Sequence, residues 1–301
     1  MLPAAGTARR PRGDAFTRLA LLLPYAWLVL FLLLPFLVVV AVSLSTKELG
    51  TPPFVPPLRL EGGVPRLAPD LGNYAYLLDD PLYAVAYLNS LKVALISTLA
   101  CLALGHPMAY AIVRAPARRR PLLLTLIILP FWTSFLIRVY AWIGILAPNG
   151  LLNVLLLWLG WTGEPLVLLS TEPAVILGIV YSYLPFMILP LYATLERLDP
   201  ALLEAASDLG CRPAAAFLRV TLPLSLPGIV AGSMLVFVPA VGEFVIPDLL
   251  GGTDSLMIGK VVWDEFFSNT DWPVASAVAV VLLLVLILPL LWLQRLQGDR
   301  R

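Results

Sequence analysis

The chain has few of the residues that build catalytic or metal sites. Among its 301 residues are one histidine, His106, and two cysteines, Cys101 and Cys211. One histidine cannot supply a metal pair or a proton relay, and no catalytic triad can be assembled around it. Two cysteines without metal-ligand spacing do not form a disulfide framework. We therefore expect no catalytic residue and no metal site, and we expect His106 to be a packing residue near a membrane interface.

Charged residues are scarce as well. Asp, Glu, Lys and Arg make up 13% of the chain, hydrophobic residues make up 60%, and the mean hydropathy is +0.90. A soluble domain is far more polar than this. A phosphate-binding P-loop is also missing, because Gly259-Lys260 is followed by Val261 and lacks the earlier glycine. We expect no cofactor in this chain, so that any ATP is bound by a partner subunit, and we expect no nucleic-acid partner.

Apolar runs, by contrast, are long and frequent. Crossing roughly 30 Å of hydrocarbon takes about 20 apolar residues. About six runs meet this length, and they are Leu19–Leu44, Leu88–Val113, Leu122–Leu146, Pro173–Leu195, Leu224–Ile246 and Val274–Leu293. The sequence predicts an all-α, polytopic membrane protein of about six transmembrane helices surrounded by lipid. It has an N-terminal tail at 1–18, a transmembrane domain at 19–293 and a C-terminal tail at 294–301.

Two further apolar segments need separate interpretation. The run Leu151–Leu159 is too short to cross the membrane, so we expect it to lie at the outer surface or to be re-entrant. The first run follows several arginines, as a secretory signal would, but it exceeds the roughly 7–15 residues of a signal core and lacks a small-x-small cleavage site. We therefore expect it to be retained as the first helix.

Basic residues occupy the polar segments that would share one side of the membrane. The positive-inside rule places that side in the cytoplasm, together with both termini. The residues concerned are Arg9, Arg10, Arg12, Arg18, Arg114, Arg118, Arg119, Arg120, Arg197, Arg212, Arg219, Arg295, Arg300 and Arg301. The other side holds only Lys47, Arg59, Arg66 and Lys260 beside many acids. This acidic outer face either attracts cationic ligands or merely reflects the retention of basic residues inside.

Two polar connections lie on the expected outer side. The external insertion at 46–87 is rich in proline and glycine, so we expect Thr46–Tyr87 to be an irregular connection with little intrinsic structure. The connection Leu249–Trp272 contains aromatic and acidic residues at 263–267. This composition predicts a short amphipathic helix at the outer surface.

A polar stretch at 196–223 separates two strongly apolar segments on the expected cytoplasmic side. Asp199 can cap a helix, and Pro200 is tolerated in a first helical turn. Gly210 suits the left-handed position that ends many helices, and Pro213 can open the next one. The pattern predicts a short helix, a sharp turn and another short helix. Such a helix-turn-helix either docks on another protein or is an ordinary surface connection.

The order of residues in this stretch adds a family resemblance. Glu204-Ala205-Ala206, then Gly210, then Val220-x-Leu222-Pro223 resembles the signature cytoplasmic loop of binding-protein-dependent ABC importer permeases of type I, with Val220 where isoleucine is usual. The resemblance implies a coupling helix that sits on the ATPase subunit. It assigns coupling to Glu204, Ala205, Ala206, Asp208, Gly210 and Arg212.

Glu243 is the most informative ionisable residue in an expected span. A carboxylate at bilayer depth costs roughly 2.5–3.5 kcal/mol, so it should face a cavity or a partner. The neighbouring Gly242, Pro239 and Pro247 indicate a broken or kinked helix end. Glu243 therefore either lines a solute route and favours a cation, or it pairs with Arg138 or caps a broken helix near the outer surface.

Arg138 lies in an aromatic segment at 131–142. The rings of this segment are either an interfacial belt with packing roles or a surface on which an amine can stack. The candidate residues of a substrate path are Glu243, Trp132, Ser134, Phe135, Arg138 and Tyr181.

Further segments narrow the resemblance to the first permease subunit of spermidine/putrescine importers. They are Phe131–Arg138, Leu71–Tyr74, Asp80–Tyr83, Gly242–Pro247 and Asp271–Pro273. The likeness extends over most of Leu19–Leu293 and is weaker at Thr51–Pro69, which resembles an insertion. Similar permeases carry other small solutes such as opines or phosphonates, so the solute stays open between these and a polyamine.

The resemblance implies a permease of the bacterial inner membrane that imports a small organic solute with ATP hydrolysed by a partner. It implies ABC ATPase subunits, a second homologous permease in a heterodimer, and an extracytoplasmic solute-binding protein. The residues alone also allow a self-contained secondary transporter. That alternative needs ion-coupling residues at mid-membrane, of which the chain has few beyond Glu243.

Overall fold

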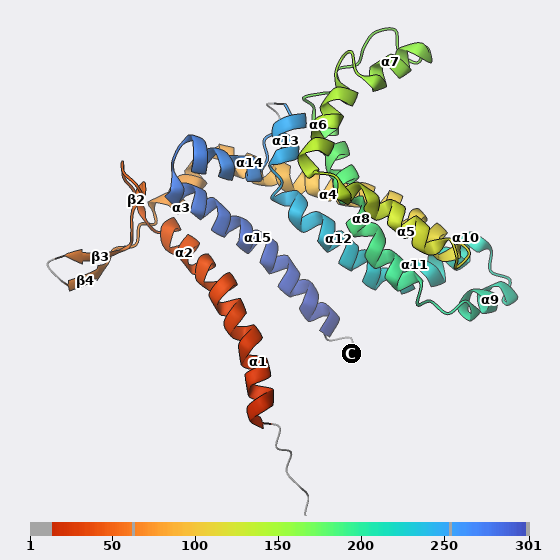
Figure 1. Cartoon of the computed structure of the whole chain (residues 1–301), viewed down its shortest axis with the longest axis horizontal. Coiled ribbons are helices and arrows are strands. Elements are labelled where there is room, and N and C mark those ends of the chain that lie inside the picture. Colours follow the sequence, from red (N-terminus) through yellow and green to blue (C-terminus); the bar gives the residue numbers. More distant parts are fainter. Residues whose placement is uncertain (1–13, 62–63, 253–254, 299–301) are drawn as a thin grey trace, which may run out of the picture.

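The structure is a computed structural model that describes residues 14–61, 64–252 and 255–298 (Figure 1). Most of its regular elements are helices, which confirms the expected all-α class. In chain order they are α1 (Asp14–Leu28), η1 (Val29–Leu33), α2 (Leu34–Ser43), β1 (Thr46–Lys47), β2 (Phe54–Val55), β3 (Leu58–Glu61), β4 (Val64–Leu67), α3 (Gly72–Asp79), α4 (Pro81–Arg114), α5 (Arg120–Ile128), η2 (Leu129–Trp132), α6 (Phe135–Leu146), α7 (Leu151–Trp158), α8 (Glu172–Leu195), α9 (Ala201–Asp208), α10 (Pro213–Ala216), η3 (Phe217–Thr221), α11 (Leu222–Leu224), α12 (Leu226–Val241), α13 (Val245–Leu250), α14 (Ile258–Trp263), η4 (Asp264–Ser268) and α15 (Trp272–Gly298).

The helices fit a polytopic membrane protein. Four described stretches are long and apolar enough to cross a membrane, and a fifth arises if the bent pair α10–α11 and α12 counts as one span. The four are Ala20–Ser43, Pro81–Arg114, Phe135–Trp158 and Glu172–Leu195. The last expected run, Val274–Leu293, falls entirely within α15. The basic residues at positions 9, 10, 12, 300 and 301 lie outside the described residues.

The third expected run is divided rather than continuous. Leu122–Leu146 is interrupted at Thr133 and Ser134, where the backbone leaves the helix after η2 and before α6. A break of this kind is tolerated in a membrane where the chain is covered by protein or lines a cavity. The short run at 151–158 forms α7, which extends beyond α6 at one end of the molecule (Figure 1).

The connection Thr46–Tyr87, which we expect on the outer side, has more structure than its composition indicates. β1 pairs with β2 and β3 pairs with β4 in two antiparallel ribbons, and α3 follows. α4 begins at Pro81, because the Asp80 carboxylate accepts the backbone N–H of Leu82 at 2.9 Å. Two-stranded ribbons consist of edge strands, which tolerate proline. The expectation of little intrinsic structure is therefore wrong.

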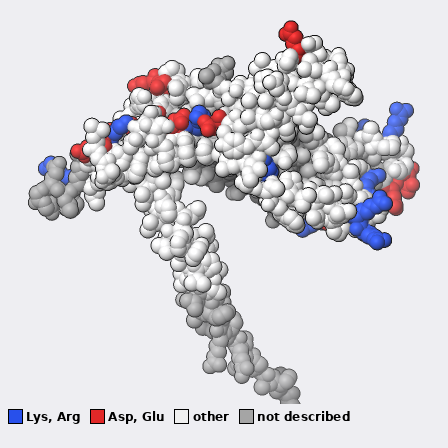
Figure 2. All heavy atoms as spheres, turned by 45° about the horizontal axis from the view of Figure 1, so that its top comes forward, with Lys and Arg blue, Asp and Glu red and all other residues white. Residues whose placement is uncertain are grey.

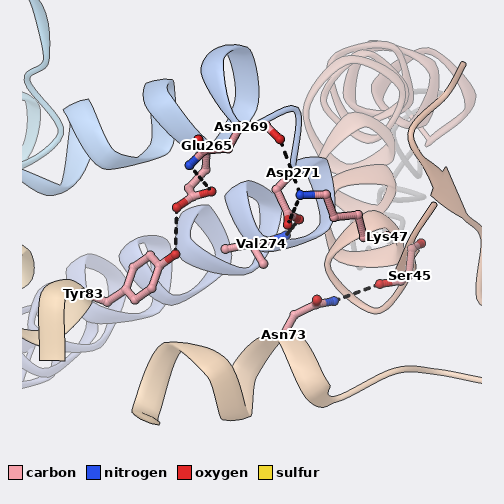
Figure 3. A network of polar contacts seen from close by, with 8 residues as sticks. All are labelled: Ser45, Lys47, Asn73, Tyr83, Glu265, Asn269, Asp271 and Val274. Carbon is pink, nitrogen blue, oxygen red and sulfur yellow. Dashed lines mark hydrogen bonds and ion pairs between the residues drawn. The ribbon is translucent and has the colours of Figure 1, made fainter. Parts of the chain in front are cut away.

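A polar network ties this outer region to the start of α15 (Figure 3). Lys47 Nζ lies 2.8 Å from Asp271 Oδ2, one residue before α15. The Tyr83 hydroxyl of α4 donates to Glu265 at 2.9 Å. The Asn73 amide of α3 donates to two backbone carbonyls at the end of α2. These contacts hold the outer ends of α2, α3, α4 and α15 together.

The core of the bundle lies among α4, α8 and α12, which run side by side in Figure 1. Large side chains that are fully buried there include Val93 of α4 and Ile179, Met187, Ile188 and Leu191 of α8. α8 is apolar around its circumference, as expected of a helix that neighbours cover on several sides. α1 leaves this core, and its residues from Ala20 to Leu28 are exposed, so lipid or another chain must cover the leucines among them.

Glycines set the separation of the three core helices. A Cβ at Gly228 of α12 would lie 2.6 Å from Thr194 Oγ1 and 2.9 Å from the Pro190 carbonyl oxygen. A Cβ at Gly232 would lie 2.8 Å from Met187 Sδ. Small residues at such positions allow helix backbones to approach closely in lipid. The spacing of the two glycines in the sequence predicts this contact, and the structure confirms it.

We expect Gly228→Ala to destabilise the bundle. The new methyl group would overlap a backbone oxygen that cannot move away, which costs about 1–3 kcal/mol in overpacked sites. Gly144→Ala in α6 is the matched control, because no atom outside its own helix lies within 4 Å of the added Cβ. Thermal unfolding of the two purified variants should show a clear loss for position 228 and little change for position 144. Equal melting temperatures would contradict the close-packing account.

Candidate functional sites

The loop between α8 and α12 contains the short helix, turn and second helix that its sequence predicts. The Asp199 carboxylate accepts the backbone N–H of Ala201 at 3.0 Å, and α9 begins there after Pro200. The helix ends before Gly210, whose φ of 76° is left-handed. Pro213 then opens α10. Each start and stop signal is thus used in the expected way.

α9 stands apart from the bundle, beyond the ends of α8 and α12 (Figure 1). Its acids Glu204 and Asp208 are exposed, and so are Leu202 and Leu209 at 46% and 88%. Figure 2 shows basic side chains gathered at the same end of the molecule. The loop therefore offers a helix whose polar and apolar side chains have little cover from this chain.

A cavity of about 380 Å³ lies among η2, α6, α8 and the segment that follows α12. Its polar side chains are Ser182, Tyr183, Arg138 and Glu243. Its aromatic residues, besides Tyr183, are Phe131, Phe135, Phe186 and Phe244. The cavity thus combines one carboxylate, one guanidinium and several ring faces.

Glu243 belongs to a break in the helical path between α12 and α13. Its Oε1 accepts the backbone N–H of Val245 at 3.1 Å and that of Ile246 at 3.5 Å. It therefore satisfies backbone N–H groups at the start of α13 that have no acceptor within the helix. The Tyr183 hydroxyl donates to the other carboxylate oxygen. With 7% of its surface exposed, Glu243 is buried in a set of three donors. These contacts correspond to the capping alternative and compensate the burial of its charge.

Arg138 faces the same cavity without an ionic partner. Its Cζ lies 5.1 Å from the Phe131 ring centre and 5.8 Å from that of Phe135, and its Nε is buried without a hydrogen-bond partner. Among the ion pairs of the described residues, none joins Arg138 to Glu243. The alternative in which these two residues form a pair is therefore wrong. Both residues line the cavity.

The structure brings together only part of the expected substrate path. Glu243, Arg138 and Phe135 line the cavity. Trp132 is 76% exposed, and Ser134 is exposed at the start of α6. These last two residues border the cavity in sequence but do not line it.

Tyr181 lies on another side of α8. Its ring packs edge-to-face on Trp142 at 5.4 Å, and it lines an apolar groove with residues of α4 and α5. Residues two positions apart on a helix do not face the same way. Tyr183 therefore reaches the cavity where Tyr181 does not, and sequence analysis missed it. The spacing of Tyr183 and Phe186, three residues apart, was the available signal for a shared face.

Close packing and an ion pair account for Gly259 and Lys260 in α14. A Cβ at Gly259 would lie 2.3 Å from the Gly242 carbonyl oxygen, so this glycine permits α14 to approach the break after α12. Lys260 Nζ donates to Asp248 at 2.5 Å and lies 3.6 Å from Asp264. The hydrogen bond to Asp248 raises the pKa of Lys260 above its ordinary value. The expected short helix in this connection is present as α14 and η4.

Comparison with known proteins gives concordant results. The profile of a family described as "Binding-protein-dependent transport system inner membrane component" matches residues 101–301. The chain is 45% identical over 265 residues to the spermidine/putrescine transport system permease protein PotB of Salmonella typhimurium, which covers 88% of each chain. It is 44% identical to PotB of Escherichia coli, with 88% of this chain and 92% of that protein covered.

More distant matches agree in kind. A putative 2-aminoethylphosphonate transport system permease protein, PhnU of Salmonella choleraesuis, is 32% identical, with 76% of this chain and 80% of that protein covered. Among solved structures, a bacterial ABC transporter involved in import of the acidic polysaccharide alginate matches with a TM-score of 0.71. It is 18% identical and covers 95% of this chain and 96% of its own, so it shows the fold alone.

We expect Glu243→Ala to destabilise the break between α12 and α13. The substitution leaves two backbone N–H groups and the Tyr183 hydroxyl without their acceptor, a loss of about 1–3 kcal/mol. Glu243→Gln keeps an amide oxygen for the backbone donors and should cost less. Thermal unfolding of both variants in the same detergent measures the difference. Two variants as stable as the parent protein would show that Glu243 is not a cap.

Proposed function

The chain belongs to the family of binding-protein-dependent transport system inner membrane components, and from this premise we propose that it is the polyamine-conducting permease subunit of its ABC importer. The observation that carries the choice of solute is the identity of 44–45% over 88% of the chain with spermidine/putrescine permeases. The energy would come from ATP hydrolysed by a partner, and this chain would have no ATPase site of its own.

The exposed helix α9 supports a coupling role for the loop at 196–223. Its caps define a short, rigid helix, and its leucines and acids lack cover within this chain. An ATPase subunit that received α9 in a groove would bury Leu202 and Leu209 and would meet Glu204, Asp208 and Arg212 at the rim. Closure of two such subunits would then move the loop as a unit.

Charge distribution supports the proposed orientation. The exposed arginines of α4, α5 and the α9 loop gather at one end of the molecule, which would be the cytoplasmic end (Figure 2). Both termini would lie on that side. The outer end, with its ribbons, α7 and α14, would face the solute-binding protein. The exposed surface of α1 would contact lipid or a second, homologous permease in a heterodimer.

The polar cavity is the proposed solute path. A polyamine carries ammonium groups on an apolar chain, so a carboxylate and aromatic faces are its natural partners. Glu243 would supply the charge and Phe135 a ring, while Arg138 would limit how long a cation stays. Trp132 and Ser134 would line the approach to this cavity. Tyr181 would belong to the path only if α8 rotated.

Arg138 also favours a second candidate solute. A small zwitterion with an amine and an anionic group would match Glu243 and Arg138 at once, and a guanidinium suits phosphonate oxygens. The similarity to a putative 2-aminoethylphosphonate permease is consistent with this alternative.

We expect two substitutions in the loop to uncouple ATP hydrolysis from import. Gly210→Pro cannot adopt the φ of 76° that ends α9, and Glu204→Arg reverses a charge at the docking surface. Both positions are exposed, so the variants should fold. The measurement is ATP hydrolysis and solute uptake in proteoliposomes that contain the permease, its ATPase and the binding protein. Normal uptake with normal ATPase stimulation would rule out this coupling surface.

Uptake of labelled spermidine and putrescine by the same proteoliposomes tests the solute. We expect ATP-dependent uptake, with a reduction of roughly tenfold for Glu243→Gln, because one charge-assisted contact contributes about 1.5–3 kcal/mol. Uptake of 2-aminoethylphosphonate with polyamines ignored would replace the polyamine by the zwitterion. Uptake by this chain alone without ATP would contradict the importer as a whole.

A further inference from the structure

The one histidine of the chain is part of a buried contact between two helical segments that the proposed function does not use. His106 of α4 is 6% exposed, and its Nε2 lies 3.2 Å from Ser225 Oγ. The Ser225 hydroxyl is fully buried and donates to the Leu222 carbonyl at 2.9 Å. Because a serine has one hydroxyl hydrogen, His106 Nε2 is the donor in its contact with Ser225.

A ring contact reinforces this hydrogen bond. The Phe217 ring of η3 meets His106 edge-on at 5.3 Å and Tyr110 edge-on at 5.9 Å. Arg114, one turn further along α4, lies over the Tyr110 ring at 4.7 Å. One face of α4, with His106 and Tyr110, thus contacts both η3 and Ser225. The contacts of α4 with η3 and Ser225 join residues more than a hundred positions apart, so local structure does not impose them.

The contact lies at a sharp bend of the chain near the α9 loop. Ser225 separates α11 from α12, and the two helical segments on either side of it meet at 65°. η3, which precedes the bend, is a π-helical turn, a form found often at functional sites. On the other side, Pro107 follows His106 inside α4 and removes one backbone hydrogen bond there. Without the contact between His106 and Ser225, both α4 at Pro107 and the bend at Ser225 would deform easily.

We propose that His106 is a positioning residue for transport, which holds the Ser225 bend rigid so that movement of the α9 loop reaches the core helices. This role rests on the proposed coupling function of α9. Movement of α9 and α10 passes to η3 and Ser225, and His106 and Phe217 pass it to α4. Gly105, next to His106, packs closely on Met187 of α8, so the movement would pass from α4 to α8.

The alternative is that the bend absorbs the movement. A helix break with one free hinge changes its angle at low cost, and the helices beyond it stay where they are. The His106 hydrogen bond closes this route, because changing the angle at Ser225 requires breaking a buried contact. The site should therefore affect the efficiency of coupling more than the stability of the fold.

His106→Phe is the primary test. It keeps a ring against Phe217, removes only the donor to Ser225, and leaves the Ser225 bond to the Leu222 carbonyl in place. In the proteoliposomes described above, we expect the ATP hydrolysed per solute imported to rise by roughly threefold to tenfold, as the loss of one buried hydrogen bond predicts. His106→Gln, whose amide can donate from a similar position, should restore the parent ratio.

Further variants distinguish the effect of the His106–Ser225 hydrogen bond from that of general packing. Ser225→Ala should raise the ratio to the same degree, and the double variant His106→Phe/Ser225→Ala should be no worse than either single variant. Tyr110→Phe is the matched control. It keeps the second ring on Phe217, and we expect its ratio to equal that of the parent protein.

The outcomes distinguish this proposal from the function on which it rests. If the parent complex imports no solute with ATP, the importer assignment is wrong, and so is the positioning role of His106 that rests on it. If the parent complex couples normally and His106→Phe keeps the parent ratio of ATP hydrolysed to solute imported, only the positioning role of His106 is overturned. A fall in uptake and ATP hydrolysis by the same factor, with a lowered melting temperature, would also overturn it, because that pattern indicates a structural role alone.

Discussion

The close contact between α8 and α12 fixes the positions of the core helices, on which the cavity and the His106 contact both depend. Lipid tails are as apolar as leucine, so helices in a membrane associate through tight packing rather than through the hydrophobic effect. Gly228 and Gly232 permit that packing, and Gly105 of α4 packs on Met187, the residue that Gly232 also meets. The polar cavity lies towards one end of this three-helix unit and the His106 contact towards the other. In the proposed mechanism, such close packing would transmit the movement of one helix to its neighbours.

A second constraint shapes the places where helices stop. Backbone N–H and C=O groups inside a membrane need partners, so each break must supply its own. Between α12 and α13 the supplier is Glu243, whose carboxylate accepts two backbone donors while the Tyr183 hydroxyl occupies its other oxygen. At the bend before α12, Ser225 satisfies the Leu222 carbonyl and receives His106. Glu243 and Ser225 thus each supply hydrogen bonds at a place where the helical path is interrupted.

The molecule leaves several surfaces uncovered, and each corresponds to a partner in the proposed assembly. α9 would be covered by an ATPase, α1 by lipid or a second permease, and the outer ribbons and α14 would meet the solute-binding protein. The ion pair of Lys47 with Asp271 links the segment of the ribbons to the start of α15. In this proposed arrangement the chain would contribute the solute path and the coupling helix α9. ATP would be hydrolysed by another subunit.

The sequence by itself determined the class of the protein, most of the helical segments, and the start and stop of α9, because apolar length, prolines, glycines and caps act locally. It also predicted a broken helix at Gly242 and a role for Glu243. It could not decide that Thr46–Tyr87 forms ribbons, that the third run divides at Thr133, or that Tyr183 rather than Tyr181 faces the cavity. Those outcomes depend on how each helix is rotated and on which distant segment meets it. The contact of His106 with Ser225 likewise arises only when α4 packs against the bend, so tertiary structure alone decided the role proposed for this residue.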